Sequence, residues 1–209
     1  CQGMGYDAGQ LDVRIVQLTT LFRKGEPVKM STRAGEFVTL RELLDEVGPD
    51  ATRFFFVMRK IETHLDFDLD LAKEQSEKNP VFYIQYAYAR MASILVKSKC
   101  PSYAKASAGK QNLGLLQHPR EMALIKQMIK LPEVVEVIAQ DYHVQRLTKY
   151  ATDLARAFHC FYTDCPVLGS DGQGQAGDRT GTDLMGTQTG IEQARLALTR
   201  ATQIVLKNT

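Results

Sequence analysis

The spacing of apolar and polar residues first predicts a short mixed segment of strand and helix. Residues 12–22, DVRIVQLTTLF, are rich in β-branched side chains, which favours a strand, and the polar RKGEP that follows favours a turn. Residues 39–47 begin with Thr39 and Glu42 at the spacing of a capping box. These residues therefore predict a helix that ends at Gly48.

The middle of the chain predicts further helices. Asp50 is expected to cap the apolar segment ATRFFFVMRK, and HLDFDLDLA is expected to lead into a polar helix that ends near Lys78. Asn79 suits the cap of the next helix and Pro80 suits its first turn, so residues 80–97 are predicted to form a long helix.

The C-terminal half is also predicted to be helical. The clearest pattern runs from Val144 to Cys165, where apolar residues recur at three- and four-residue spacing. The stripe consists of Leu147, Tyr150, Ala151, Leu154, Phe158 and Phe161. Before it, His118 and Pro119 open a helix through Leu131, and Pro132 starts another.

Two polar segments interrupt this helical pattern. Residues 98–114 and 169–190 are small and polar without useful periodicity, so both are predicted to be loops, and a final helix is expected from Ile191. The fold class is therefore mainly α, a helical bundle preceded by a short α/β segment.

The composition of the chain indicates what class of protein it is and in which compartment it is found. With 44% hydrophobic residues, no apolar run of about eighteen residues and no signal-peptide pattern, the chain is expected to be a soluble, cytoplasmic monomer. Its cysteines, Cys1, Cys100, Cys160 and Cys165, lack C-x-x-C spacing and are interpreted as reduced thiols. The chain opens on Cys1 without a Met and stops inside an amphipathic run, so we expect an excised fragment.

Charge is unevenly distributed although the formal net charge is only +2. Residues 97–130 carry seven basic side chains against Glu121, whereas residues 62–77 carry six acidic side chains against Lys73. The basic stretch can meet phosphate, and each stretch taken alone also fits an ordinary solvated surface.

The sharpest local motif is K-M-S-T-R-A-G, residues 29–35, followed by E-F-V-T-L. It lies in a polar loop after a predicted strand and resembles the K-M-S-K-S loop of class I aminoacyl-tRNA synthetases, in particular the arginyl-tRNA synthetase family. The resemblance continues through further segments in the order of that family. These segments are DATRFFFVMR (residues 50–59), LDFDLDLA (65–72), NPVFYIQYAYAR (79–90), RLTKYATDLA (146–155), FYTDC (161–165) and ARLALTRATQIVLKN (194–208).

The resemblance implies a division of labour along the chain. Residues 1–60 would be the end of a Rossmann-type catalytic domain, and residues 61–209 a helical anticodon-binding domain of the DALR type, truncated at its C-terminus. The full-length parent would ligate L-arginine to its tRNA through an arginyl-adenylate, using ATP and Mg²⁺. The fragment alone would be inactive and hold no cofactor, since no H-I-G-H-like motif is present.

Site residues follow from the same resemblance. Lys29, Ser31 and Arg33 are the catalytic candidates, and Lys29, Met30 and Ser31 are the ATP-binding candidates, because cationic and hydroxyl groups stabilise charge that develops on phosphate oxygens. The second lysine of the family motif is Thr32 here, and Arg33 is the candidate to supply the missing cation.

Recognition of an anticodon requires a different set of side chains, because unpaired bases stack on aromatic rings. Tyrosines on the helix over 80–97 and Tyr162 are the candidate rings, and polar neighbours are candidates for base edges or phosphates. The tRNA-binding candidates are Asn79, Tyr83, Gln85, Tyr86, Arg90 and Tyr162. Tyrosines at helical spacing are also common in cores, so each ring has a structural alternative.

Three alternatives stay open at this stage. The chain can be a non-catalytic helical RNA-binding or scaffold module, or part of another class I synthetase such as the cysteinyl enzyme. The alternating carboxylates of D-F-D-L-D suggest a cation site, although Asp68 and Asp70 are better explained by helix entry. The four histidines and the cysteines show no metal-ligand spacing, so no metal site is predicted.

Overall fold

The computed structural model describes residues 2–7, 9, 13–30, 37–98, 113–168 and 185–209 of the chain. They belong to two compact units. Unit 1 comprises Cys1–Gln75 with His143–Gln145, and unit 2 comprises Ser76–Tyr142 with Arg146–Thr209. Helices make up most of the described chain, so the predicted mainly α fold class is confirmed. The assignment of residues 1–60 and 61–209 to two functional domains stays a prediction.

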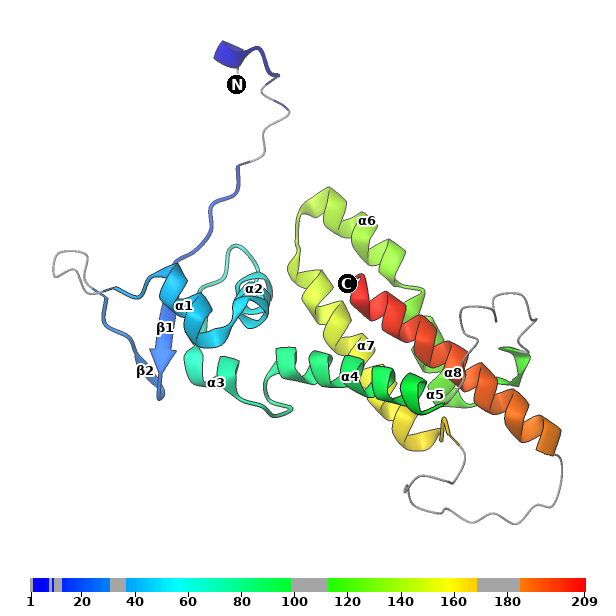
Figure 1. Cartoon of the computed structure of the whole chain (residues 1–209). Coiled ribbons are helices and arrows are strands. Elements are labelled where there is room, and N and C mark those ends of the chain that lie inside the picture. Colours follow the sequence, from blue (N-terminus) through cyan, green and yellow to red (C-terminus); the bar gives the residue numbers. More distant parts are fainter. Residues whose placement is uncertain (1, 8, 10–12, 31–36, 99–112, 169–184) are drawn as a thin grey trace. The chain divides into compact units, whose positions relative to one another are not determined.

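Unit 1 is built around a three-stranded sheet with the order β2-β1-β3. β1 pairs antiparallel with β2 and parallel with β3, in a register that places Thr19 opposite Leu65. The elements, shown in Figure 1, are η1 Gln2–Met4, β1 Thr19–Arg23, β2 Glu26–Pro27, α1 Leu40–Val47, α2 Pro49–Val57, β3 Leu65–Asp68 and α3 Leu69–Lys73.

The strand β3 lies in the segment that the sequence predicts only as the lead into a polar helix. Leu65 and Phe67 are buried while Asp66 between them is exposed, which is the two-residue period of a strand. Phe67 packs on Phe55 of α2, with ring centroids 5.3 Å apart. The helix that follows ends at Lys73 rather than near Lys78, so the prediction of a longer polar helix is wrong.

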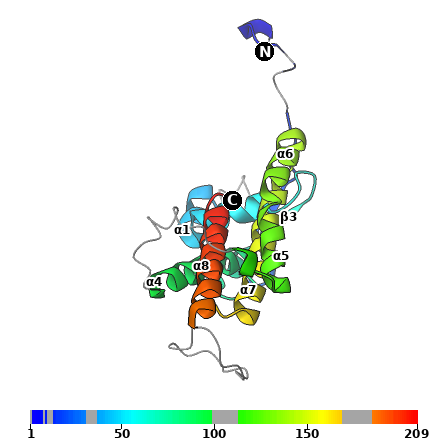
Figure 2. The same ribbon diagram turned by 90° about the vertical axis from the view of Figure 1, so that its right-hand side faces the viewer.

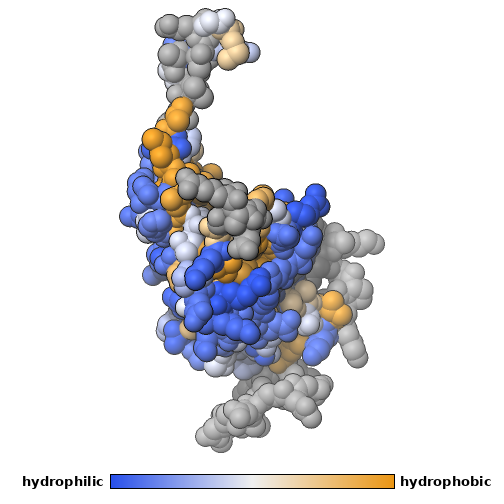
Figure 3. All heavy atoms as spheres, turned by 90° about the vertical axis from the view of Figure 1, so that its left-hand side faces the viewer, coloured by the Kyte–Doolittle hydropathy of each residue, from blue (hydrophilic) through white to orange (hydrophobic). Residues whose placement is uncertain are grey.

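Two other predicted boundaries in unit 1 are corrected. β1 begins at Thr19 rather than at residue 12, because the residues before it lack a paired strand in the described part of the chain, and apolar side chains such as Ile15 stay exposed. Figure 3 shows hydrophobic residues at the surface of this face of the protein. The cap of α2 is Gly48, not Asp50. Gly48 has φ 91°, ends α1 and precedes Pro49, so Asp50 lies inside the first turn.

Unit 2 is a bundle of helices (Figures 1 and 2). Its elements are α4 Pro80–Lys97, η4 Leu113–Leu115, α5 Pro119–Met128, α6 Leu131–Asp141, α7 Gln145–Asp164 and α8 Met185–Lys207. The predicted helices over 80–97 and 144–165 are confirmed as α4 and α7, and α5 ends three residues before the predicted Leu131.

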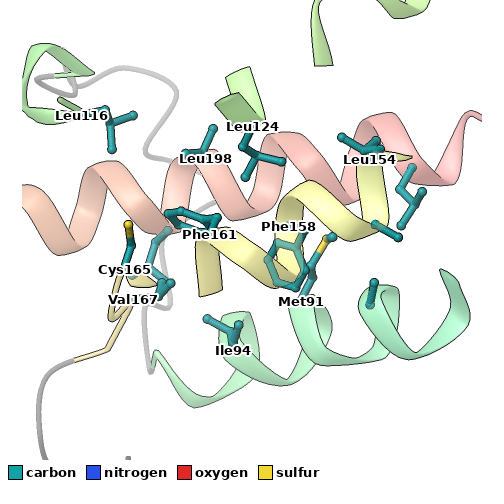
Figure 4. Close-up of a cluster of buried hydrophobic side chains, with 14 of the residues drawn as sticks. Met91, Ile94, Leu116, Leu124, Leu154, Phe158, Phe161, Cys165, Val167 and Leu198 are labelled. Carbon is teal, nitrogen blue, oxygen red and sulfur yellow. The ribbon is translucent and has the colours of Figure 1, made fainter. Parts of the chain in front are cut away.

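The core of unit 2 lies among α4, α7 and α8. Figure 4 shows Met91 and Ile94 of α4 facing Phe158 and Phe161 of α7, with Leu198 of α8 close by. All five side chains are buried. The apolar stripe on α7 is thus the central face of the bundle, as its spacing predicts.

The last helix begins earlier than the sequence predicts. α8 starts at Met185 rather than Ile191 and so includes the glycine- and threonine-rich turns before Ile191. At Gly190 an added Cβ would lie 3.2 Å from Cδ1 of Leu115 in η4. The absent side chain at Gly190 permits this close approach, a packing effect that composition does not reveal.

Candidate nucleic-acid interface

The segment that carries Lys29 follows a tight β-hairpin. Lys24 and Gly25 join β1 to β2, and their φ angles of 55° and 77° are both positive, as a two-residue type I′ turn requires. Beyond the hairpin, the backbone N–H of Val28 donates to the carbonyl oxygen of Leu21 at 2.8 Å. The chain therefore arrives at Lys29 from a fixed position beside the sheet.

The segment ends at an equally well-defined helix start. The backbone N–H of Glu42 donates to the hydroxyl of Thr39 at 3.2 Å, and the N–H of Thr39 donates to the Glu42 carboxylate at 2.7 Å. The hydrogen bond from the Thr39 backbone, followed by that from its hydroxyl, lowers the pKa of Glu42. The predicted capping box is confirmed and fixes the first turn of α1.

A network of three charged side chains links the elements on both sides of this segment. The carboxylate of Glu46 on α1 lies 2.8 Å from the guanidinium of Arg23 on β1 and 2.5 Å from the ammonium of Lys73 on α3. All three side chains are partly exposed, so each pair contributes at most about 1 kcal/mol. Together they join the sheet to two helices of unit 1.

The structure describes only the first part of the K-M-S segment. Lys29 and Met30 are both exposed. Ser31, Thr32 and Arg33 lie outside the described residues. What the structure shows is an exposed lysine directly after a fixed hairpin, in a position where its charge can reach a ligand.

The acidic D-F-D-L-D run has structural partners. Asp68 caps α3 by accepting hydrogen bonds from the backbone N–H groups of Asp70 and Leu71, at 2.9 and 3.0 Å. The carboxylate of Asp70 accepts from the N–H of Lys24 in the hairpin turn. These bonds confirm the helix-entry interpretation. Within the described ranges no group of three His, Cys, Asp or Glu side chains is placed to hold a metal ion.

Asn79 holds the start of the tyrosine-bearing helix α4. Its side-chain oxygen accepts hydrogen bonds from the N–H groups of Val81 and Phe82 at 3.0 and 3.4 Å, and the residue is only 4% exposed. Pro80 occupies the first helical turn. Asn79 is therefore placed to orient α4 rather than to present its side chain at the surface.

Three of the predicted tRNA-binding residues meet where α4 and α7 face each other. The guanidinium carbon of Arg90 lies 4.4 Å from the ring centroid of Tyr162 and 5.3 Å from that of Tyr86. A guanidinium over an aromatic face is a favourable cation–π arrangement, and both groups can stack on a nucleic-acid base. Tyr86 is 45% exposed, so this arrangement reaches the surface.

The same cluster contains a residue that sequence reasoning did not select. The imidazole of His159, on α7, lies 4.7 Å from the ring centroid of Tyr83 and 5.8 Å from that of Tyr86. Burial raises the pKa of Tyr83, which keeps its hydroxyl protonated. His159 follows Phe158 of the apolar stripe, and only the crossing of α4 over α7 reveals its neighbours. We call Phe82, Tyr83, Tyr86, Arg90, His159 and Tyr162 the aromatic cluster.

Gln85 is exposed on α4 and directly precedes Tyr86 in the sequence. Tyr88 is exposed as well, two residues further along the helix. Two residues correspond to about 200° around a helix, so Tyr86 and Tyr88 face different directions.

The basic stretch is only partly described. Lys97, Lys126 and Lys130 are exposed in unit 2. The guanidinium of Arg120 is bound to the carboxylate of Asp164 at 2.6 Å, which leaves less of its charge for a ligand. Three further lysines of the stretch, at positions 99, 105 and 110, lie outside the described residues.

Comparison with known proteins assigns this architecture to a family. The sequence model of the DALR anticodon binding domain matches residues 84–209, which is more than half of the chain. This chain belongs to the DALR anticodon-binding domain family. The matched range contains four of the six residues of the aromatic cluster, Tyr86, Arg90, His159 and Tyr162, while Phe82 and Tyr83 lie just before it.

Relatives of this DALR protein match along almost its whole length. A protein of Moorella thermoacetica named arginine–tRNA ligase is 45% identical over 99% of the chain, and one of the same name from Heliobacterium modesticaldum is 44% identical over 99%. The match covers 34% of each relative. The chain thus spans about a third of the length of the curated relatives it matches.

Solved structures show the same fold. A crystal structure from Campylobacter jejuni described as an arginyl-tRNA synthetase aligns with 99% of the chain and 41% of its own, with a TM-score of 0.74 and 25% identity. The Thermus thermophilus arginyl-tRNA synthetase aligns with 84% of the chain and 26% of its own, with a TM-score of 0.54 and 23% identity. None of the helices in the described part of the DALR protein is long and apolar enough to cross a membrane.

Proposed function

We propose that this chain is part of an arginine–tRNA ligase, in which unit 2 binds the anticodon loop of the tRNA and unit 1 contributes a lysine loop to the activation of L-arginine by ATP. Support comes from relatives of that name, which match across 99% of the chain. The parent protein, rather than this third of it, would carry the complete reaction, which we place in the cytoplasm. A monomeric state stays a prediction.

The observation that carries the proposal is the aromatic cluster within a DALR domain. An anticodon is a single-stranded loop whose bases can leave their stack and rest on aromatic or guanidinium planes. Tyr86, Arg90 and Tyr162 offer both kinds of plane at one place, with Arg90 able to attract the phosphates as well. Asn79 contributes indirectly, since its capping bonds orient α4, and Gln85, which is exposed on the same helix, is a candidate to contact a base edge.

The lysine loop would act on the phosphates of ATP. When the arginine carboxylate attacks the α-phosphate, negative charge grows on the phosphate oxygens as pyrophosphate leaves. Lys29 would meet that charge, with Met30 and Ser31 beside the nucleotide and Arg33 in place of the second lysine of the family motif. One such donor typically accelerates a reaction by about 10²- to 10³-fold. Mg²⁺ would arrive as its complex with ATP, since this ion is usually held by substrate phosphates.

Two other functions are less well supported. A scaffold without enzymatic chemistry does not account for relatives that are named ligases over the whole chain, including residues 1–83 outside the DALR match. A cysteinyl synthetase would use a related helical domain, but the relatives reported above carry the arginine name.

The proposal is tested with the complete reading frame that contains this chain. The purified protein should attach arginine to tRNA in the presence of ATP and Mg²⁺ and should not attach cysteine. In that protein Lys29→Ala should slow arginine-dependent pyrophosphate exchange by about 10²-fold or more through kcat, because the interaction forms in the transition state. Lys126→Ala, an exposed lysine in unit 2, is the matched control for loss of a positive charge.

Either of two results would count against the proposed activity. A complete protein that attaches cysteine, or no amino acid, would contradict the arginine assignment. A Lys29→Ala variant with unchanged exchange kinetics would remove Lys29 from the reaction while leaving the arginine assignment intact.

A further inference from the structure

His159 is enclosed by aromatic rings of the aromatic cluster. Its imidazole plane is inclined by only 19° to the ring of Tyr86, and Tyr86 stacks in turn on Phe82 with ring centroids 6.1 Å apart and an angle of 15°. Tyr83 lies against the imidazole at a steeper angle of 50°. Tyr86 is the half-exposed member of this group, so its ring separates part of the imidazole from solvent.

One nitrogen of this imidazole makes no hydrogen bond to the part of the chain that the structure describes. Nε2 of His159 is buried and has no partner among those residues. A hydrogen bond between His159 and the Tyr83 backbone raises the pKa of the imidazole. A bond has this effect when a ring N–H donates to a backbone carbonyl oxygen. Since Nε2 has no partner, that N–H is on Nδ1, and Nε2 keeps its lone pair as an acceptor. A buried acceptor without a donor is uncommon in folded proteins.

The surroundings keep the ring neutral. Burial, followed by the nearby charge of Arg90, lowers the pKa of His159, and the opposing contributions of the Tyr83 backbone and Glu77 do not reverse this. At neutral pH the imidazole is therefore uncharged. Its Nε2 can accept a hydrogen bond but cannot donate one.

We propose that His159 selects the base that stacks at the aromatic cluster, with Nε2 accepting a hydrogen bond from the exocyclic amino group of an unpaired cytosine or adenine. This inference rests on the proposed function, in which the cluster binds an anticodon loop. Cytosine and adenine carry an amino group at the edge where uracil and guanine carry a carbonyl oxygen. With uracil, two acceptors would face each other, so the site would reject it.

Access to Nε2 needs a movement of side chains only. Tyr86 is 45% exposed, and changes of side-chain rotamer are common when an interface forms while the backbone moves little. When the Tyr86 ring turns outward, a base can enter at the edge of the imidazole and stack on the Tyr86 ring and the Arg90 guanidinium. The amino group of that base then donates to Nε2, whose lone pair lies in the plane of the imidazole.

The experiment uses the 209-residue chain and RNA hairpins. The reference hairpin is the anticodon stem–loop of an arginine tRNA, and in its variants each unpaired cytosine is replaced singly by uracil, or each unpaired adenine by purine, which lacks the amino group. Replacement of the base at one loop position should weaken binding to the wild-type chain about tenfold relative to the reference hairpin. This is the order of magnitude expected for the loss of one hydrogen bond to a buried group. Fluorescence anisotropy with labelled hairpins measures the dissociation constants.

Substitutions at His159 then assign the effect. His159→Phe keeps an aromatic ring without an acceptor, so it should bind the reference hairpin and the discriminating variant equally. His159→Gln supplies an amide oxygen and should retain part of the preference. Tyr88→Phe, an exposed aromatic residue on α4, is the control and should keep the full preference. Circular dichroism establishes that each variant is folded.

The outcomes separate this inference from the proposed function. A folded His159→Phe variant that still discriminates, or a wild-type chain that binds all the hairpins equally, would overturn the role of His159 while leaving RNA binding in place. A preference for uracil over cytosine would overturn the acceptor assignment of Nε2. A chain that binds none of the hairpins would contradict anticodon-loop binding itself, and the inference would fail with it.

Discussion

A buried ion pair in unit 2 predicts a large effect on stability. The carboxylate of Glu121 is fully buried, and Oε1 accepts a hydrogen bond from Nε of Arg195 on α8 at 2.6 Å. Its Oε2 accepts from the backbone N–H of His118 at 2.9 Å, which completes the capping box of α5. Arg195 also donates to the carbonyl oxygen of Pro166, just after α7. One glutamate therefore holds α5 and α8 together.

Replacing Glu121 with Ala removes both interactions at once. The Arg195 side chain is 15% exposed, so its charge would lose its partner in a largely buried place. Breaking a buried pair in this way typically costs about 3–5 kcal/mol, and the lost half of the capping box is part of that cost. Glu121→Gln keeps an acceptor oxygen but removes the charge, and should cost about 1–3 kcal/mol.

Urea unfolding followed by the helical circular dichroism signal measures these changes. Glu136→Ala, an exposed glutamate on α6, is the matched control and should change the free energy of unfolding by less than about 0.5 kcal/mol. A Glu121→Ala variant whose unfolding free energy matches that control would show that the pair does not hold α5 to α8. The reasoning from burial and hydrogen bonding would then be refuted.

Two further predictions concern titratable groups of unit 2. Burial raises the pKa of the Cys165 thiol from 9.0 to about 11, so iodoacetamide should modify Cys165 only after unfolding. The free energy of unfolding should also fall as the pH rises from about 9 towards 11, because the unfolded thiol loses its proton first. Rapid modification of the native chain, detected by mass spectrometry, would contradict this. The pKa of His159 is lowered in the folded chain, so the unfolded chain binds the proton first and the free energy of unfolding should fall as the pH drops below about 6.5. His159→Phe should remove the contribution of His159 to this dependence on pH. An unchanged dependence in the variant would contradict the prediction.

Local signals in the sequence predicted much of the fold. The capping box at Thr39, the Asn79–Pro80 start of α4 and the apolar stripe on α7 each depend on residues within one or two turns, and all three are present in the structure. Elements whose boundaries depend on distant partners were predicted less well. β1 starts where β3 begins to pair with it, and the strand at Leu65 was hidden by the acidic residues that alternate with its buried side chains.

The candidate site shows the same limit. The tyrosines and Arg90 were identified from their residue types within a family-like helix, and the structure brings Tyr86, Arg90 and Tyr162 together. Local sequence does not indicate a role for His159. It lies one residue beyond Phe158 of the apolar stripe, and nothing near it in the sequence shows that α4 places Tyr83 and Tyr86 against it. The crossing of two helices, which no local pattern encodes, makes it part of the cluster.

The central claim, that the aromatic cluster binds an anticodon loop, is tested most directly by equilibrium binding of the 209-residue chain to two RNAs. One is an arginine anticodon stem–loop, and the other carries a scrambled loop on the same stem. Both are measured at two salt concentrations, with folded Tyr86→Ala and Tyr162→Ala variants, and with Lys126→Ala as a control. The wild-type chain should bind both RNAs more weakly at high salt and should prefer the arginine loop.

Each tyrosine variant should lose that preference by an amount that corresponds to about 1–3 kcal/mol of stacking, whereas the lysine variant should weaken both RNAs alike. Folded Tyr86→Ala and Tyr162→Ala variants that keep the full preference for the arginine loop would contradict the claim.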